Sequence, residues 1–501
     1  MATPQPARTE AHVAVRNLTL LSASLGTVVL LGFVVRAILR RQLDPGAFGP
    51  FDAAESFTFA WGIVLGLGVD AYVRTTISVE PSRASAFVGS TLWLRLVLMV
   101  PLALGMWGVM RLTHRDAAFM ELVWVLSGVQ LLLAVNATFA ALLQANTTVG
   151  GLPAVNLGAR VLWGAGAMLG VEAGLGVAAI GWAWLGSELL KAVASGWLCR
   201  RHLGLRFGWP ALGSTVAIVG ATLPYFLHTL FRTVGSKADV FILSVVAEGV
   251  LGEAAGRQET AWYGAAATLG GLATMLTPLL AGVLAPMLAR TRTQDAAAYE
   301  GLVRRTLELA LIASIPMTLL IGVGADTWVR VMFGEEYGPA VPAVRLLAPV
   351  YLLNYASLVA VMVLQVEGKL RQLAWLAGGA MAAVLVLDVV AAQVAMNAHG
   401  AGAGGTACAA VQLGGELALA VAMFWLLGRR AIDRRTTSML LKTALVAALV
   451  VGVDLGLRAV GLDAALGFAR LGLDSVLYLA VIFGARVVVW KEVQGFLREA
   501  F

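Results

Sequence analysis

Apolar residues recur along the chain in long blocks, and charged residues gather in the short segments between them. A helix crosses the hydrocarbon of a bilayer with about 20 mainly apolar residues. By this criterion the sequence predicts fourteen transmembrane helices, near 18–39, 51–72, 85–110, 120–144, 149–171, 175–199, 215–246, 261–289, 306–328, 342–366, 372–397, 401–428, 438–457 and 465–489.

Composition agrees with this pattern. Hydrophobic residues make up 59% of the chain and charged residues only 13%, whereas a soluble domain carries about 25% charged residues. The first apolar run, Leu18 to Leu39, is longer than the roughly 7–15 residues of a signal-peptide core, so we expect a retained helix. The sequence therefore predicts an all-α integral membrane protein and excludes a soluble enzyme.

Lysine and arginine are frequent in every second predicted loop and less frequent in the loops between. Because cytosolic loops carry the excess of these residues, the pattern predicts a multi-pass protein of the cell inner (cytoplasmic) membrane with both termini in the cytosol. The longest predicted outer loops, Ala247–Thr260 and Val329–Val341, are short. They leave no room for a periplasmic catalytic domain, which argues against a membrane glycosyltransferase or ligase.

A short repeat divides the predicted helices. Phe48-Gly49 stands just before the second helix and Tyr263-Gly264 at the start of the eighth, each followed by small residues. With equal helix counts, this predicts an N-lobe of helices 1–6 over residues 1–212 and a C-lobe of helices 7–12 over residues 213–430. Helices 13–14 then form a C-terminal pair over residues 431–501. Two such lobes, related by an axis along the membrane normal, enclose a central cavity.

Basic residues inside the predicted helices are the first candidates for a binding site. Four of them, Arg36, Arg345, Arg470 and Arg486, lie near helix ends, where snorkelling to the headgroups is expected. A deeper arginine or lysine costs about 2.5–3.5 kcal/mol on insertion scales and normally faces a cavity or a partner. The deeper set predicts a cationic site for a phosphate or pyrophosphate and comprises Arg95, Arg160, Lys191 and Arg232, with Lys237 beyond them.

Acidic residues inside the helices have two interpretations. A buried carboxylate can take up a proton or a sodium ion when a cavity opens to the other side of the membrane, or it can be a hydrogen-bonded structural group. Glu188 stands three residues before Lys191, so these two can pair on one helix face. The candidates for ion coupling are Glu188, Asp239, Asp388 and Glu416.

Cofactor chemistry finds no support in the sequence. The five histidines and two cysteines lack metal-ligand spacing, and no GxxxxGK motif is present. The stretch Gly400–Gly405 fits GxGxxG, but an apolar helix follows it and no strand precedes it, so the nucleotide-binding context is missing. We expect no cofactor and no metal; an H⁺ or Na⁺ gradient, the substrate gradient or downstream pull would supply the energy.

Several motifs, in order, resemble those of one transporter family. The signatures are Arg40-Arg-Gln-Leu-Asp-Pro-Gly-Ala-Phe-Gly49, Gly66-Leu-Gly-Val-Asp-Ala-Tyr-Val-Arg74, Leu223-Pro-Tyr-Phe226 with Lys237-Ala-Asp-Val-Phe-Ile-Leu243, Trp262-Tyr-Gly-Ala-Ala266 and Phe333-Gly-Glu-Glu-Tyr-Gly338. Together they resemble the Wzx-type lipid-linked oligosaccharide flippases (polysaccharide repeat unit flippases) of the multidrug/oligosaccharidyl-lipid/polysaccharide exporter superfamily.

The resemblance implies a function and a set of partners. It implies a V-shaped bundle with a cationic central cavity that moves an undecaprenyl-pyrophosphate-linked oligosaccharide from the cytosolic to the periplasmic leaflet by alternating access. The product would feed capsule, O-antigen or exopolysaccharide assembly, with membrane lipid, a polysaccharide polymerase and a co-polymerase as partners and no nucleic acid.

Two alternatives within the superfamily stay open: a lipid II flippase and a cation-coupled drug antiporter. Lipid II flippases typically carry an Arg-Asp motif after the first helix, whereas Arg36 and Arg40 are followed here by Ala37 and Arg41. Drug-extruding relatives usually have twelve helices. A membrane glycosyltransferase or ligase is a remoter alternative.

Overall fold

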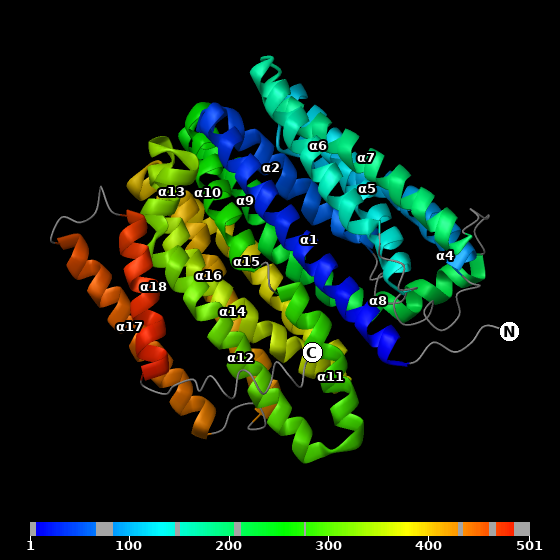
Figure 1. Ribbon diagram of the computed structural model, residues 1–501. Helices are drawn as coiled ribbons and strands as arrows, with labels where there is room; N and C mark the ends of the chain where they lie inside the picture. Colours follow the sequence, from blue (N-terminus) through cyan, green and yellow to red (C-terminus); the bar gives the residue numbers. More distant parts are fainter. Residues whose placement is uncertain are drawn as a thin grey trace. The chain divides into compact units, whose positions relative to one another are not determined.

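A computed structural model describes residues 7–66, 84–145, 151–204, 212–274, 277–428, 434–459 and 467–484 (Figure 1). These residues are almost entirely helical, and no strand occurs among them. Eight of the described helices are long and apolar enough to cross a membrane, which confirms an all-α membrane protein. The total of fourteen stays a prediction. The eight are Phe87–Leu112, Ala117–Gln144, Leu152–Glu172, Gly176–Leu203, Ala298–Val323, Glu335–Val366, Leu370–His399 and Ala403–Leu427.

Two compact units make up the chain, Met1–Val245 and Val246–Phe501. The helix at 212–237 groups with the first unit, and the helices beyond residue 430 group with the second. The division into an N-lobe at 1–212, a C-lobe at 213–430 and a C-terminal helix pair at 431–501 has other boundaries and stays a prediction.

The first unit consists of long helices joined by short turns. In α2, Asp44 caps the N-terminus by accepting a hydrogen bond from Ala47 N at 2.9 Å, and Pro45 occupies the first turn, as is usual at helix starts. The elements are α1 (Ala7–Gln42), α2 (Pro45–Gly62), η1 (Ile63–Gly66), α4 (Ala84–Leu112), α5 (Ala117–Ala145), α6 (Leu152–Glu172), α7 (Gly176–Leu203), α8 (Leu212–Lys237) and α9 (Asp239–Leu251).

Helices α6 and α7 form a hairpin, and α5 packs along α7 while α1 packs along α6 (Figure 1). Small residues bring them close: Gly164 lies against Val35 of α1, and Gly128 lies against Leu185 of α7. Helix α2 packs on α5 with Phe51 and Phe57 in the core. This packing brings α1, α2, α6 and α7 together around the polar side chains described below.

The second unit is built around one helix. Helix α14 has 61% of its most apolar window buried, the largest share among the eight candidate spans, and it packs against α10, α11, α12 and α16. Helices α17 and α18 lie side by side on α12 (Figure 1). The elements are α10 (Glu253–Ala273), α11 (Thr277–Gln294), α12 (Ala296–Val323), α13 (Ala325–Phe333), η4 (Glu335–Ala340), α14 (Val341–Val366), α15 (Leu370–His399), α16 (Ala403–Leu427), α17 (Arg434–Ala459) and α18 (Gly467–Gly484).

Both predicted outer loops prove to be helical. The segment Ala247–Thr260 contains the end of α9 and the start of α10, joined at Gly252 with φ +85°. The segment Val329–Val341 contains the end of α13 and all of η4, joined at Gly334 with φ +100°. Hydropathy alone marks polar residues as loop, but a helix continues through polar sequence until a residue that favours left-handed φ ends it.

Three predicted spans are also divided. The span 215–246 is interrupted at Ala238 between α8 and α9, and 306–328 is interrupted at Gly324 between α12 and α13. The span 261–289 covers parts of α10 and α11. Other predictions fall outside the described residues, including most of the Gly66–Arg74 motif, Arg486 and the chain termini.

Candidate functional site

Two ion pairs join α1 to α2. Arg36 and Arg40 stand one turn apart on α1, and Asp52 and Glu55 stand one turn apart on α2. The Arg36 guanidinium donates two hydrogen bonds to the Glu55 carboxylate, one of them at 2.7 Å, and both side chains are half-buried. Arg40 Nη2 lies 2.7 Å from Asp52 Oδ1 with its side chain fully buried. The hairpin thus carries one deeply buried pair and one more accessible bidentate pair.

These contacts correct two predictions. Arg36 is paired within the bundle rather than snorkelling to the headgroups, and Arg40, which lies between the predicted spans 18–39 and 51–72, is buried rather than in a loop. Neither arginine has an acidic residue within one turn on α1 itself. The short turn after Gln42 returns the acids of α2 to the level of the arginines on α1, which a comparison across the turn could have found.

Arg160 of α6 adjoins the Arg36–Glu55 pair. Both Arg36 and Glu55 act on it electrostatically. Its guanidinium lies 4.3 Å from the ring centre of Trp163, a cation–π arrangement. It also covers the backbone of Gly32 on α1, where a Cβ would overlap the guanidinium. The glycine therefore makes room for a half-buried cation beside an existing ion pair.

Glu188 of α7 is a further electrostatic neighbour of Arg160. Asn136 of α5 donates from Nδ2 to Glu188 Oε2 at 2.7 Å and to its backbone carbonyl at 3.1 Å. Lys191 Nζ lies 3.5 Å from the same carboxylate oxygen, so the pair predicted from their spacing forms. Glu188 is thus positioned by one neutral donor and flanked by two cations.

Lys237, the last residue of α8, belongs to the same neighbourhood. Its side chain is exposed, lies 6.0 Å from the ring centre of Phe59, and acts electrostatically on Glu55. Ser56 donates a hydrogen bond to its backbone carbonyl. We use the name polar cluster for the set formed by Arg36, Glu55, Arg160, Glu188, Lys191 and Lys237.

Other predicted site residues of the first unit are placed differently. Arg95 of α4 is fully buried and donates from Nε to the carbonyl of Leu65 in η1 at 2.8 Å. Arg232 is half-buried on α8 and interacts electrostatically with His228, one turn away. Asp239 is buried at the start of α9 and accepts from Val240 N at 2.8 Å. Ligand contact by Arg95 and Arg232 and ion coupling by Asp239 stay predictions.

In the second unit, two predicted carboxylates lie within the helix bundle. Asp388 of α15 is fully buried. Glu416 of α16 accepts from Ser357 Oγ of α14 through its Oε1 at 2.9 Å. Asp388 lies on α15, which packs against α16, and Glu416 lies on α16 itself. Their role in ion coupling stays a prediction.

The glycine-rich stretch at 400–405 has a role that the sequence did not reveal. The buried carboxylate of Glu259 on α10 accepts hydrogen bonds from Gly402 N and, at 2.7 Å, from Gly405 N. These amides begin α16, where unpaired N–H groups favour an anion. The chain fills the site with its own carboxylate, which joins α10 to α16.

Arg470 was expected to snorkel, and this is wrong. It is buried near the start of α18, with Nε 2.9 Å from Asp454 and Nη2 3.4 Å from Asp326. Arg345 is exposed and lies 3.9 Å from the same Asp326. Charges from three other elements therefore meet around Asp326 of α13.

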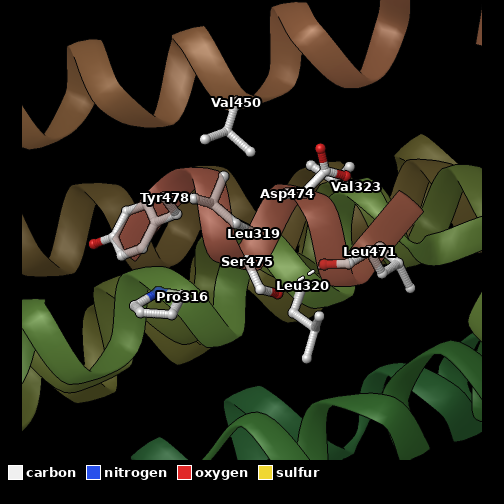
Figure 2. A pocket seen from close by; sticks show the side chains of 9 residues that line it. All are labelled: Pro316, Leu319, Leu320, Val323, Val450, Leu471, Asp474, Ser475 and Tyr478. Atoms are coloured by element: carbon white, nitrogen blue, oxygen red, sulfur yellow. Dashed lines mark hydrogen bonds between the residues drawn. The ribbon is translucent and has the colours of Figure 1, made fainter. Parts of the chain in front are cut away.

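A small cavity lies between α12, α17 and α18 (Figure 2). Apolar side chains dominate it, with Asp474, Ser475 and Tyr478 from α18; Ser475 Oγ donates to Leu471 O at 2.8 Å. Its volume is about 80 Å³, compared with roughly 150 Å³ for a cavity that admits benzene. It is too small for a lipid chain and is best regarded as a packing defect.

Within the described ranges, no group of three or more His, Cys, Asp or Glu residues could hold a metal ion.

With this geometry described, comparison with known proteins gives the family. The family model described as "Polysaccharide biosynthesis protein" matches residues 38–342, more than half of the chain. The chain belongs to this polysaccharide biosynthesis protein family. The match covers the α1–α2 hairpin from Ile38 onward and the rest of the first unit. No curated protein matches the chain.

Solved structures show the fold of this family member. A "Lipid II flippase MurJ, inward closed conformation" has 10% identity and a TM-score of 0.67, over 92% of this chain and 98% of that one. An inward-facing multidrug resistance MATE family transporter of the MOP superfamily has 18% identity and a TM-score of 0.59, over 83% and 97%. A MOP superfamily transporter from Pyrococcus furiosus has 16% identity and a TM-score of 0.57, over 82% and 95%.

These likenesses confirm the resemblance drawn from the sequence at the level of family and fold. The polysaccharide biosynthesis protein has the transporter fold shared by MATE and MurJ proteins. At such low identities the structures inform the fold alone.

Proposed function

We propose that this protein is a flippase that moves an undecaprenyl-pyrophosphate-linked oligosaccharide from the cytosolic to the periplasmic leaflet by alternating access. The membership in a polysaccharide biosynthesis family supports a lipid-linked sugar as cargo. The transporter fold supports translocation rather than enzymatic chemistry. The inner membrane, cytosolic termini, a polymerase with a co-polymerase, and independence from cofactors belong to the same proposal.

The polar cluster is the observation that carries the proposal. It places four cationic side chains, Arg36, Arg160, Lys191 and Lys237, beside two carboxylates, Glu55 and Glu188. The cations therefore outnumber the anions. Arginine binds phosphate oxygens in bidentate geometry, and a half-buried site strengthens such contacts relative to water. A diphosphate can bind the surplus cations and compete with Glu55 for Arg36.

Arg160 is the residue best suited to the first contact. It is half-buried, it is stacked on Trp163, and its guanidinium packs against Gly32 of α1. Stacking holds the planar fork while leaving donors available to a ligand. Lys237 is exposed, so its long side chain can change conformation and keep its ammonium group near the diphosphate. The oligosaccharide itself would require neutral polar and aromatic neighbours.

A lipid II flippase is the second candidate, because MurJ shares the fold over 92% of this chain. It would use the same cationic cluster for the same diphosphate. A cation-coupled drug antiporter would instead need the carboxylates to attract a cationic drug, and the excess of cations in the polar cluster argues against this. A membrane glycosyltransferase or ligase gains no support from the fold.

Gene deletion with complementation tests the proposal. We expect deletion to abolish surface polysaccharide and to leave the lipid-linked repeat unit in the cytosolic leaflet, with restoration by the wild-type gene. Unchanged polysaccharide together with new drug sensitivity would support the antiporter. Loss of cell-wall synthesis with unchanged polysaccharide would support the lipid II flippase.

A further inference from the structure

A shallow groove on the first unit lies apart from the polar cluster. Its volume is about 560 Å³, and it is lined by three helices, α4, α5 and α7. Its three tryptophans are 40–54% exposed, whereas Trp163 and Trp184 in the core are 1% and 8% exposed. The groove tryptophans are therefore surface groups. The side chains that matter are Trp107, Arg111, Glu121, Trp124 and Trp182.

The groove lies near one end of its helices. Arg111 is in the last turn of α4, Glu121 is in the second turn of α5, and Trp182 is in the second turn of α7. At 1.5 Å per residue, Glu121 and Trp182 are within about 10 Å of the starts of their helices. Tryptophan and arginine at this depth are typical of the boundary between headgroups and hydrocarbon.

Beyond the groove, exposed apolar side chains continue along two of its helices, α4 and α7. Val100 and Leu104 of α4 are 61% and 64% exposed, and Leu189 and Val193 of α7 are 52% and 65% exposed. In a membrane protein, such side chains contact lipid tails. The groove therefore lies at the headgroup end of a lipid-facing surface.

Each of the two charged side chains in the groove, Arg111 and Glu121, contacts a tryptophan. The Arg111 guanidinium lies 5.5 Å from the ring centre of Trp107. The Glu121 carboxylate accepts from Trp182 Nε1 at 3.3 Å. An interfacial belt is enriched in tryptophan and tyrosine, with lysine and arginine as further anchors, so a carboxylate is not one of its usual groups. An exposed carboxylate among lipid phosphates is unfavourable unless a cation faces it, because like charges repel.

We propose that the groove binds the headgroup of a zwitterionic phospholipid with a primary ammonium, of the phosphatidylethanolamine type. Arg111 binds the phosphate, and Glu121 accepts hydrogen bonds from the ammonium. The acyl chains lie along the exposed apolar residues of α4 and α7. The opposite charges of the groove match the two charges of this headgroup, whereas an anionic lipid would satisfy only Arg111.

Native mass spectrometry of the purified full-length protein tests this. The protein is equilibrated in nanodiscs with equal amounts of phosphatidylethanolamine and phosphatidylglycerol, and the retained lipids are counted. We expect the wild type to prefer phosphatidylethanolamine and Glu121→Gln to lose that preference by about fivefold, the upper end for an exposed ion pair. Arg111→Gln should reduce retention of both lipids.

Arg201→Gln is the matched control, because Arg201 also stacks on an exposed tryptophan, Trp197 at 5.1 Å, near the other end of α7. It should keep the wild-type lipid preference. Unchanged preference in Glu121→Gln, with a wild-type melting temperature, would overturn the proposal and leave an ordinary interfacial belt. Displacement of the lipid by a soluble oligosaccharide would also overturn it, in favour of a sugar platform.

Discussion

In the first unit Arg36 and Arg40 of α1 are bonded to carboxylates of α2, whereas in the second unit Glu259 and Glu416 accept hydrogen bonds from neutral donors. The second unit also has ion pairs, in which the buried Arg470 of α18 lies beside Asp454 of α17 and Asp326 of α13. Similar bundles thus stabilise ionisable groups in different ways.

The difference matters for transport. An arginine paired with a carboxylate can exchange that partner for a phosphate, whereas a carboxylate bonded to a hydroxyl can exchange a proton without losing a charged partner. In our proposal the first unit therefore binds the anionic cargo, and Asp388 and Glu416 of the second unit stay candidates for coupling together with Glu188 and Asp239. Four predictions test this contrast, beginning with the largest expected effect.

Breaking the buried Arg40–Asp52 pair should cost most. Arg40→Met leaves Asp52 buried without its ion-pair partner, and we expect the free energy of unfolding to fall by about 3–5 kcal/mol. The double variant Arg40→Met with Asp52→Leu should recover most of this loss, because both charges are removed. Thermal unfolding in detergent measures both. A double variant as unstable as the single one would show that Arg40 acts through other contacts.

Arg160→Ala should impair export without preventing accumulation of the protein. Loss of a charged hydrogen bond is worth about 1.5–3 kcal/mol, so export of the surface polysaccharide should fall by roughly tenfold to a hundredfold. Arg160→Lys should recover part of it, since lysine keeps the charge but not the bidentate fork. The measurement is polysaccharide output in a deletion strain, normalised to protein in the membrane.

Arg201→Ala is the matched control for Arg160→Ala, because Arg201 also stacks on a tryptophan but lies outside the polar cluster. It should export normally. If Arg160→Ala exports normally as well, the cationic site lies elsewhere. If Arg160→Ala fails to accumulate, Arg160 is structural.

A smaller effect is expected for Glu259→Gln in the second unit. Glutamine retains one acceptor oxygen but loses the charge that favours the N-terminus of α16, which is worth about 1 kcal/mol. Faster hydrogen exchange at Gly402 and Gly405 would show the weakened cap. Glu416→Gln is a suitable comparison, because its neutral partner Ser357 can still donate, and exchange at the cap should not change.

Topology labelling has no energetic effect but tests the predicted orientation of the chain in the membrane. A single cysteine at Glu253, exposed at the start of α10, should react with a membrane-impermeant reagent from the periplasm. A cysteine at Asp295, exposed between α11 and α12, should be protected until the membrane is permeabilised. The reverse pattern would overturn the predicted orientation.

The sequence alone determined the class of the protein and most of its long helices. Predicted ranges such as 85–110 and 372–397 agree closely with α4 and α15, because burial in lipid requires a local run of apolar residues. The family followed from motifs that are also local. The Glu188–Lys191 pair was predictable for the same reason, since both residues lie on one helix face.

Tertiary structure decided which charges meet. Arg36 finds Glu55 on the next helix, Arg470 finds Asp326 far away in the chain, and Glu259 finds the glycines at the start of α16. Hydropathy gives the cost of placing a charge in the membrane but not the partner that offsets it. That partner is fixed by how the helices pack, and packing depends on side-chain shapes along whole helices rather than on any short stretch of sequence.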